Sequence, residues 1–262
     1  MTVIGSIESV WRYPVKSMRG ETLDEAFIGF AGVYGDRVYA FTSPEAPKGF
    51  PFHTSREQEE LLLYTPKYAD RSVAGRPVNL AEADSMAPGM TPLYAPVASL
   101  GVEVTTPDGE VFSVDSAELV ADMQKRLGAA LTVSLMTSER ALTDCRPVSI
   151  FSLQTVAGLA EEIEESVDKR QFRANIYADF EGKEAFFEKG LIGSRIKIGE
   201  KAEFLVIEND PRCKMITLNP DTAKASPKIL RQVTTKHDGF AGLYTVVLGE
   251  GVVRPGDKIS VA

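Results

Sequence analysis

Apolar and polar residues alternate with a period of two along much of the chain. The alternation is clear at residues 3–11, and residues 102–106 and 111–114 flank the turn sequence Pro107-Asp108-Gly109, which favours a hairpin. The other segments that we expect to form strands are 36–41, 131–136, 172–177, 195–198, 203–207, 214–218, 243–248 and 258–261. Many short strands separated by turn residues favour β-barrels or sandwiches over a parallel, doubly wound sheet.

Three segments are instead predicted to be helices. Residues 152–167 repeat apolar side chains at the three-and-four spacing of a helix, residues 116–127 have capping residues at both ends, and residues 226–236 have a proline in the first turn. Residues 72–96 are rich in Ala, Pro, Gly and Met and predict a long irregular excursion, and residues 29–35 predict a glycine-rich turn. The first helix lies between two clusters of strands. We therefore expect a mainly β fold of the β-barrel-rich α+β kind, with two β-barrel-like domains, 1–114 and 115–262, and a few short helices.

Composition and charge place the chain among ordinary globular proteins. It has 262 residues, of which 44% are hydrophobic and 25% charged. The net charge of −8 disfavours nucleic acid as a partner, because a nucleic-acid binder needs a basic face. No segment approaches the roughly 20 apolar residues of a membrane span, and the start lacks the pattern of a signal peptide. We expect a cytoplasmic protein without a membrane partner.

The two cysteines are candidates for binding a metal or for acting as a nucleophile. Cys145 and Cys213 lie far apart and in no CxxC pair, which disfavours a disulfide framework, a structural zinc site or an iron–sulfur cluster. Cys213 is flanked by Arg212 and Lys214, and cations favour the thiolate that binds soft metals or attacks electrophiles. The alternative for Cys213, and still more for Cys145, is a small buried side chain at the start of a strand.

Several basic residues lie beside turns in otherwise apolar sequence: Arg12, Lys16, Arg19, Arg37, Arg173 and Arg212. Any one of them could be an ordinary surface or ion-paired residue. An arginine inside a strand, as we expect for Arg173, must face solvent, a carboxylate or a bound anion. Together these residues predict a pocket for phosphate or carboxylate in an acidic protein.

Taken as a set, the motifs resemble those of one family. WRYPVKS at 11–17 and the later Gly35-Asp36-Arg37 resemble the N-terminal β-barrel half of MOSC proteins. FRANI at 172–176 and RCKMITLNPDT at 212–222 resemble the MOSC domain itself, as do Gly242-Leu243-Tyr244 and VRPGD at 253–257. The resemblance covers essentially the whole chain.

This resemblance implies a molybdenum cofactor, molybdenum bound to molybdopterin, held between two β-rich domains. Better-known members of the family reduce N-hydroxylated compounds such as amidoximes and hydroxylamines. The residue that matches the metal ligand, and so carries catalysis, is Cys213. Those that match the cofactor-binding region are Lys16, Ser17, Arg37, Cys145, Arg146, Arg173, Asn175, Arg212 and Tyr244. The implied substrate is a small N-oxygenated molecule.

Two departures from the family bear on the chemistry. Residue 146 is Arg where the amidoxime reducers carry a small hydroxyl residue, and residue 211 is Pro where some relatives have Ser. A cation near the metal would alter its redox potential or its substrate. The chain ends at Ala262 without the ferredoxin-like extension of some bacterial relatives. We therefore expect electrons from a separate reductase, or from a ferredoxin- or cytochrome-type protein.

Two other functions use the same residues. In a sulfur carrier or sulfurtransferase, Cys213 would hold a persulfide. In a non-catalytic cofactor-binding protein, the cleft would hold the molybdenum cofactor without turnover.

Overall fold

A closed β-barrel is the largest element of the protein. The structure is a computed structural model that describes residues 1–87, 89–128 and 131–261. Around the barrel the strands follow in the order β11 (Ile176–Asp179), β10 (Val148–Ser152), β14 (Phe240–Gly249), β13 (Ala202–Pro211), β12 (Arg195–Ile198), β16 (Lys258–Val261) and β1 (Thr2–Arg12). Pairing of β1 with β11 closes the ring, and β2 (Glu21–Leu23) continues the sheet beyond β1. The mainly β prediction is confirmed.

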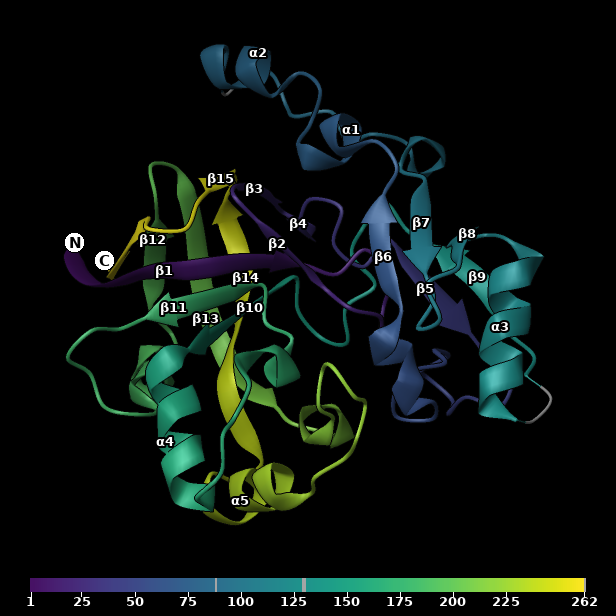
Figure 1. The fold of residues 1–262 in the computed structure, drawn as a ribbon. Helices are drawn as coiled ribbons and strands as arrows, with labels where there is room; N and C mark the ends of the chain where they lie inside the picture. The colour runs from purple at the N-terminus through teal and green to yellow at the C-terminus, as the bar shows by residue number, and fades with distance from the viewer. Residues whose placement is uncertain (88, 129–130, 262) are drawn as a thin grey trace.

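The barrel joins the two ends of the chain. Strand β1 runs antiparallel to both β16 and β11, so the N- and C-termini lie side by side (Figure 1). A strand from the start of the sequence therefore shares one sheet with strands from beyond residue 147. The division of the chain at residue 114 stays a prediction.

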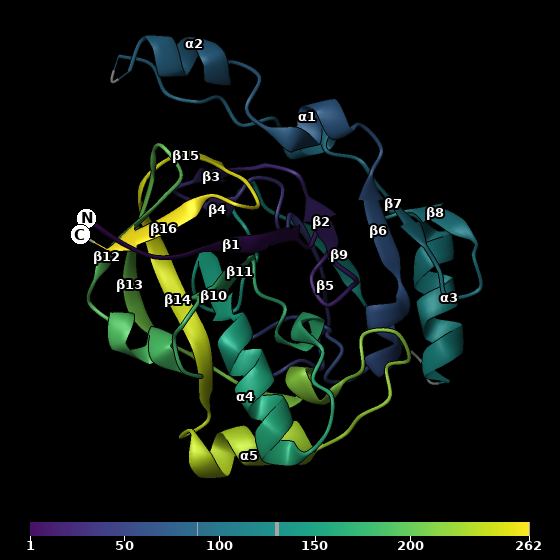
Figure 2. The ribbon, with the colours of Figure 1, turned by 60° about the vertical axis from the view of Figure 1, so that its left-hand side comes forward.

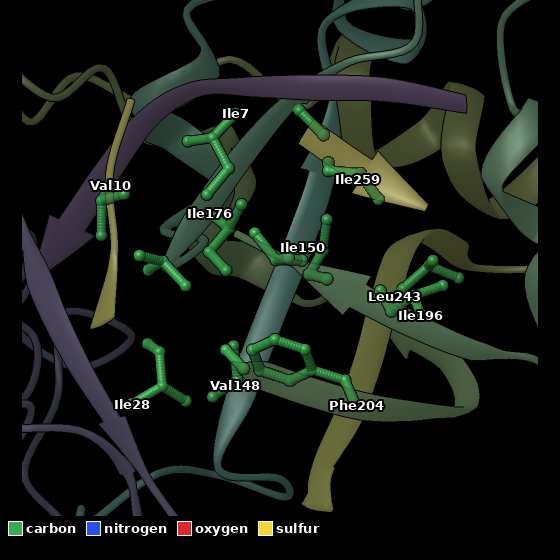
Figure 3. Close-up of a cluster of buried hydrophobic side chains, with 14 of the residues drawn as sticks. Ile7, Val10, Ile28, Val148, Ile150, Ile176, Ile196, Phe204, Leu243 and Ile259 are labelled. Carbon is green, nitrogen blue, oxygen red and sulfur yellow. The ribbon is translucent and has the colours of Figure 1, made fainter. Parts of the chain in front are cut away.

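Apolar side chains fill the barrel. Ile7 and Val10 of β1 lie in one buried cluster with Ile150, Ile176 and Phe204 from the other strands (Figure 3). The inward-facing residues Ile7 and Val10 are three positions apart in β1, whereas strict alternation would place inward-facing residues two positions apart. The register shift between Ile7 and Ser9 in the β1–β11 pair accounts for this spacing, because a bulge adds one residue to one strand.

A second apolar core lies beside the barrel, and side chains from small sheets and from several helices form it. Figure 1 shows these sheets and helices next to the barrel strands. One sheet pairs β5 (Tyr39–Thr42) with β9 (Ser134–Thr137). The second has the strand order β15 (Gly251–Val253), β3 (Ala26–Gly29), β4 (Gly32–Val33), and the third has the order β6 (Thr65–Tyr68), β7 (Val102–Thr105), β8 (Val111–Ser113). Helix α3 (Ala117–Leu127) buries Leu119 and Met123 in this core. Ser116 caps the helix, and Gly128 ends it in the left-handed conformation that glycine favours, as the sequence predicts.

Two further helices pack together at one end of the barrel. In Figure 2, α4 (Leu153–Ile163) and α5 (Lys228–Lys236) lie below the strands and beside each other. The Ser152 hydroxyl accepts from the amides of Gln154 and Thr155 and so caps α4. The helix ends at Ile163, earlier than the predicted 167, because Glu164 adopts a left-handed conformation.

The segment 72–96, which was predicted to be irregular, contains helical structure. It forms α1 (Arg71–Gly75) and α2 (Leu80–Ser85), which lie above the barrel in both ribbon views (Figures 1 and 2). The Asp70 carboxylate caps α1, a local interaction that composition does not reveal. No helix within the described ranges has the length and apolar character needed to cross a membrane.

One predicted strand is wrong and another is correct only at its end, and both lie in the functional motifs. The predicted strand 214–218 is the short 3-10 helix η5 (Lys214–Thr217). Of the predicted strand 172–177, only residues 176–177 lie in β11, because the 3-10 helix η3 (Lys169–Phe172) and a turn precede it. A capping box between Asp168 and Gln171 starts η3, and β11 begins only at Ile176. Arg173 is therefore in a left-handed turn rather than inside a strand. The remaining 3-10 helices are η1 (Glu59–Leu63), η2 (Val97–Ser99) and η4 (Phe187–Leu191).

Candidate functional site

A cleft of about 740 Å³, its mouth included, lies between segments 16–56 and 143–244 of the chain. It collects nine of the ten residues that the sequence identified: Lys16, Ser17, Arg37, Arg146, Arg173, Asn175, Arg212, Cys213 and Tyr244. The tenth, Cys145, is exposed and does not line the cleft. Segments more than 200 residues apart in sequence thus meet at one place.

Three cleft residues adopt a backbone conformation that is unfavourable for side chains other than glycine. Ser17, Arg37 and Arg173 have φ angles of 69°, 46° and 53°. Each such residue costs on the order of 1 kcal/mol, and strain of this kind gathers at functional sites. Tertiary hydrogen bonds hold two of them, since the Ser55 hydroxyl donates to the Ser17 carbonyl and the Arg37 amide donates to the Tyr13 carbonyl.

Two guanidinium groups lie close together beside one aromatic ring. Arg37 lies 4.5 Å and Arg173 4.3 Å from the centre of the Tyr13 ring. Arg37 pairs with the buried Asp36 and donates to the Arg173 carbonyl at 3.1 Å. The Nη2 atom of Arg173 is buried without a hydrogen-bond partner among the residues that the structure describes. Burial lowers the Arg173 pKa to about 10 and the charge of Arg37 adds to this effect, while Tyr13 and Asp36 act against it.

Lys16 is held on the other side of the cleft. Its Nζ donates to the Leu142 carbonyl at 2.8 Å and to the Asp144 carboxylate, which Arg56 also approaches at 3.5 Å. Burial lowers the Lys16 pKa against the opposing effect of Asp144. Burial also opposes ionisation of Asp144, but Lys16 and Arg56 outweigh it and leave the Asp144 pKa below its usual value. The Leu142 carbonyl and the Asp144 carboxylate therefore fix Lys16 Nζ in place.

Cys213 lies at the start of η5, two residues after β13 ends, and is half-buried. The side chains of its two neighbours are held elsewhere. Arg212 pairs with Asp210 at 2.7 Å and donates from Nε to the Ala241 carbonyl at 2.6 Å. Lys214 donates to Glu59 and to the Arg56 carbonyl, which ties the Cys213 turn to the segment 56–59.

The remaining predicted residues have supporting contacts. The Asn175 amide is buried, accepts from Ser149 at 3.2 Å and lies 3.4 Å from the Trp11 carbonyl, so it joins strands around the cleft. Arg146 is half-exposed and pairs with Glu208 at 2.8 Å. A Cβ atom at Gly242 would lie 2.9 Å from Arg212 Nη2, so this glycine allows β14 to approach Arg212 closely.

The sequence analysis missed much of the lining. The residues it did not propose as a site are Thr54, Arg56, Thr143, Asp144, Ser149, Gln171, Phe172, Asp210, Pro211, Met215 and Ile216. Arg12, by contrast, lies outside the cleft in a buried pair with Glu21. Six cationic side chains and two carboxylates line the cleft, which leaves an excess of positive charge in an acidic protein. Such a cleft can bind an anion.

Asp210 is the buried carboxyl group of the cleft. Burial raises its pKa to about 6, although Arg212 acts in the opposite direction. A carboxyl group whose pKa is raised on folding stabilises the fold below its unfolded pKa, and this contribution is lost as the pH rises through the folded pKa.

We therefore expect Asp210→Asn to remove a pH dependence of stability. Between pH 4 and 6 the free energy of unfolding of the wild type should fall by on the order of 3 kcal/mol relative to that of the variant, because each unit of pKa shift corresponds to about 1.4 kcal/mol. Urea unfolding at several pH values measures this difference. A difference in unfolding free energy between the two proteins that does not change with pH would contradict the assignment. A pH-independent contribution from the unpaired Arg212, added to a difference that does change with pH, would not.

Among the described residues, no three His, Cys, Asp or Glu side chains are grouped to hold a metal ion by themselves. A metal in the cleft would therefore need ligands from a bound group as well as from Cys213.

Comparison with known proteins places the chain in a family. The model of the MOSC N-terminal beta barrel domain matches residues 4–129, and the model of the MOSC domain matches residues 137–260. Mitochondrial amidoxime reducing component 2 of Bos taurus is 26% identical over 248 residues, which cover 84% of this chain and 68% of the bovine protein. The Rattus norvegicus protein of the same name is 24% identical over 241 residues, with the same coverage of 84% and 68%.

A solved structure, the YuaD protein of Bacillus subtilis, aligns with a TM-score of 0.48 and 15% identity over 98% of this chain and 94% of its own. The two family models between them span most of the sequence and include every residue that lines the cleft. The chain belongs to the MOSC family, as a MOSC domain preceded by a MOSC N-terminal beta barrel domain.

Proposed function

We propose that the protein is a molybdenum-cofactor-dependent reductase of small N-hydroxylated molecules, such as amidoximes and hydroxylamines, that takes its electrons from a separate protein. One observation carries the proposal: Cys213 shares a cleft with an excess of cations, one of which, Arg173, has a buried nitrogen without a partner in the described structure. The names of the bovine and rat relatives support the reaction class.

The residues of the cleft fit such a cofactor. Its phosphate is an anion that Arg37, Arg173 and Lys16 can bind by charge-assisted hydrogen bonds, and it would compensate the Arg173 nitrogen. Ser17, Arg212 and Tyr244 complete the polar wall. The Cys213 thiolate is a soft ligand that suits molybdenum. When bound, the cofactor would supply a metal that takes two electrons from the donor protein and passes them to the N–O bond whose oxygen is removed.

The protein itself orients the substrate and handles protons. Reduction of R–NH–OH to R–NH₂ and water breaks the N–O bond and consumes two electrons and two protons. The electrons come from the donor protein, a reductase or a ferredoxin- or cytochrome-type protein. The Asp210 carboxyl, with its pKa raised by burial to about 6, can carry a proton at near-neutral pH inside the cleft.

The proposal is tested by turnover of a defined substrate. Protein from a cofactor-competent host is reduced with dithionite-treated methyl viologen and mixed with benzamidoxime, and benzamidine is measured by chromatography. We expect benzamidine to form in step with oxidation of the viologen. Metal-loaded protein that converts neither benzamidoxime nor N-hydroxylamines would contradict the proposal.

A further inference from the structure

A second pocket lies beside the cleft. Counted with its mouth, it has a volume of about 520 Å³. Trp11, Tyr13, Leu62 and Met215 supply aromatic and apolar walls. Gln171, Arg173 and Met215 border the cleft as well, so they form the partition between the two spaces.

Two arginines that each have a nitrogen without a partner border this second pocket. Arg19 Nε is buried without a hydrogen-bond partner within the described ranges, as is Arg173 Nη2. The Arg19 Nη2 atom donates to the Pro220 carbonyl at 3.1 Å, and Asp221 approaches it only to 3.7 Å. An unsatisfied buried donor is costly, and a charged one more so, which makes the Arg19 guanidinium a candidate for binding a ligand.

The third arginine on the pocket differs from these two. Arg170 is paired with both Asp168 and Asp221 and so has its charge compensated. Arg19 keeps 35% of its side chain exposed, which places it where the pocket meets solvent. Arg19 therefore supplies the donor at the outer side of the second pocket, whereas Arg173 lies on the inner partition and borders the cleft as well.

We propose that this second pocket binds a small aromatic carboxylate. The carboxylate accepts hydrogen bonds from the Arg19 guanidinium, and its ring packs against Trp11 and the apolar wall. A planar anion matches the geometry of guanidinium donors, and a flat apolar body matches the aromatic lining. The site does not depend on a bound cofactor, because Arg19 and Trp11 border the second pocket and not the cleft.

The position of Trp11 provides a direct test. It is the only tryptophan of the chain, so its fluorescence reports on this pocket alone. The full chain is titrated with 4-nitrobenzoate and with the neutral 4-nitrobenzamide, both of which quench tryptophan on contact. We expect saturable quenching by the acid, with an affinity at least tenfold above that of the amide, since a hydrogen bond between charged groups contributes about 1.5–3 kcal/mol.

Matched variants locate the binding. Arg19→Gln should lower the affinity for 4-nitrobenzoate at least tenfold and leave that for 4-nitrobenzamide unchanged. Arg19→Lys keeps the charge but not Nε, and should give an intermediate affinity. Arg56→Gln, which lies on the cleft alone, should bind the acid like the wild type. Equal affinities for acid and amide, or an acid affinity unchanged by Arg19→Gln, would overturn the proposal.

The test also separates this pocket from the proposed reductase function. The molybdenum content of each sample is measured beside its titration. Selective quenching in a sample without metal supports the second pocket on its own. Metal-loaded protein that does not prefer the acid rejects the second pocket and leaves the reductase function standing.

Discussion

Replacing Cys213 with alanine is expected to abolish reduction of benzamidoxime and to release the bound molybdenum. Cys213 is the cysteine that lines the cleft, and it lies at the start of a short helical turn next to the cationic wall. Without its thiolate, the metal loses the one ligand that we assign to the protein. Activity should fall to the level of a metal-free control, measured as benzamidine formed per chain.

Cys145→Ala is the matched control. Cys145 is exposed and outside the lining of the cleft, so its replacement should leave both metal content and turnover near the wild type. Circular dichroism and thermal melting confirm that both variants fold. Unchanged turnover in Cys213→Ala, or loss of turnover in Cys145→Ala alone, would contradict the assignment of the ligand.

Asp36→Asn is expected to destabilise the protein by about 3–5 kcal/mol, the usual result of breaking a buried ion pair. Asp36 is 1% exposed, pairs with Arg37 and accepts from the Tyr13 amide at 2.8 Å. Asparagine keeps an acceptor for that amide but removes the charge. Arg37 is then left uncompensated beside Arg173. Urea unfolding measures this loss of stability. The control is Asp24→Asn at an exposed position, which should leave the stability unchanged.

Inorganic phosphate should restore part of that stability. An anion in the cleft replaces the missing negative charge, so phosphate should raise the unfolding midpoint of Asp36→Asn by more than that of the wild type. Sodium chloride at the same ionic strength controls for screening. An equal response of both proteins to phosphate would show that Arg37 and Arg173 do not form an anion site.

The sequence predicted regular elements well where local chemistry decides them. Helix α3 begins after Ser116 and ends before Gly128 because a hydroxyl cap and a left-handed glycine are local features. Strands β12 and β16 also have the predicted bounds. By contrast, alternation alone made Arg173 part of a strand, because a positive φ at an arginine is stabilised by distant contacts and leaves no local pattern.

The site was predictable in part for a similar reason. The motifs identified the cationic residues and Cys213, because binding of an anion requires cations and binding of a soft metal requires a thiolate. Asp144 and Asp210 were missed as site residues, since a carboxylate in an anion site has no motif of its own and acts by compensating Lys16 or Arg212. The second pocket was also invisible in the sequence. Arg19 and Trp11 come together with Met215 only after β1 has joined the barrel.

The central claim is most directly tested by the number of molybdenum atoms per chain. Plasma mass spectrometry is applied to protein purified from a cofactor-competent host, with Cys213→Ala and a known molybdenum enzyme from the same host beside it. The account predicts close to one molybdenum per wild-type chain, and little or none in Cys213→Ala. No molybdenum in the wild type, while the control enzyme is loaded, would contradict it. A mass increase of about 32 Da on Cys213 after incubation with a sulfur donor would then identify a persulfide carrier instead.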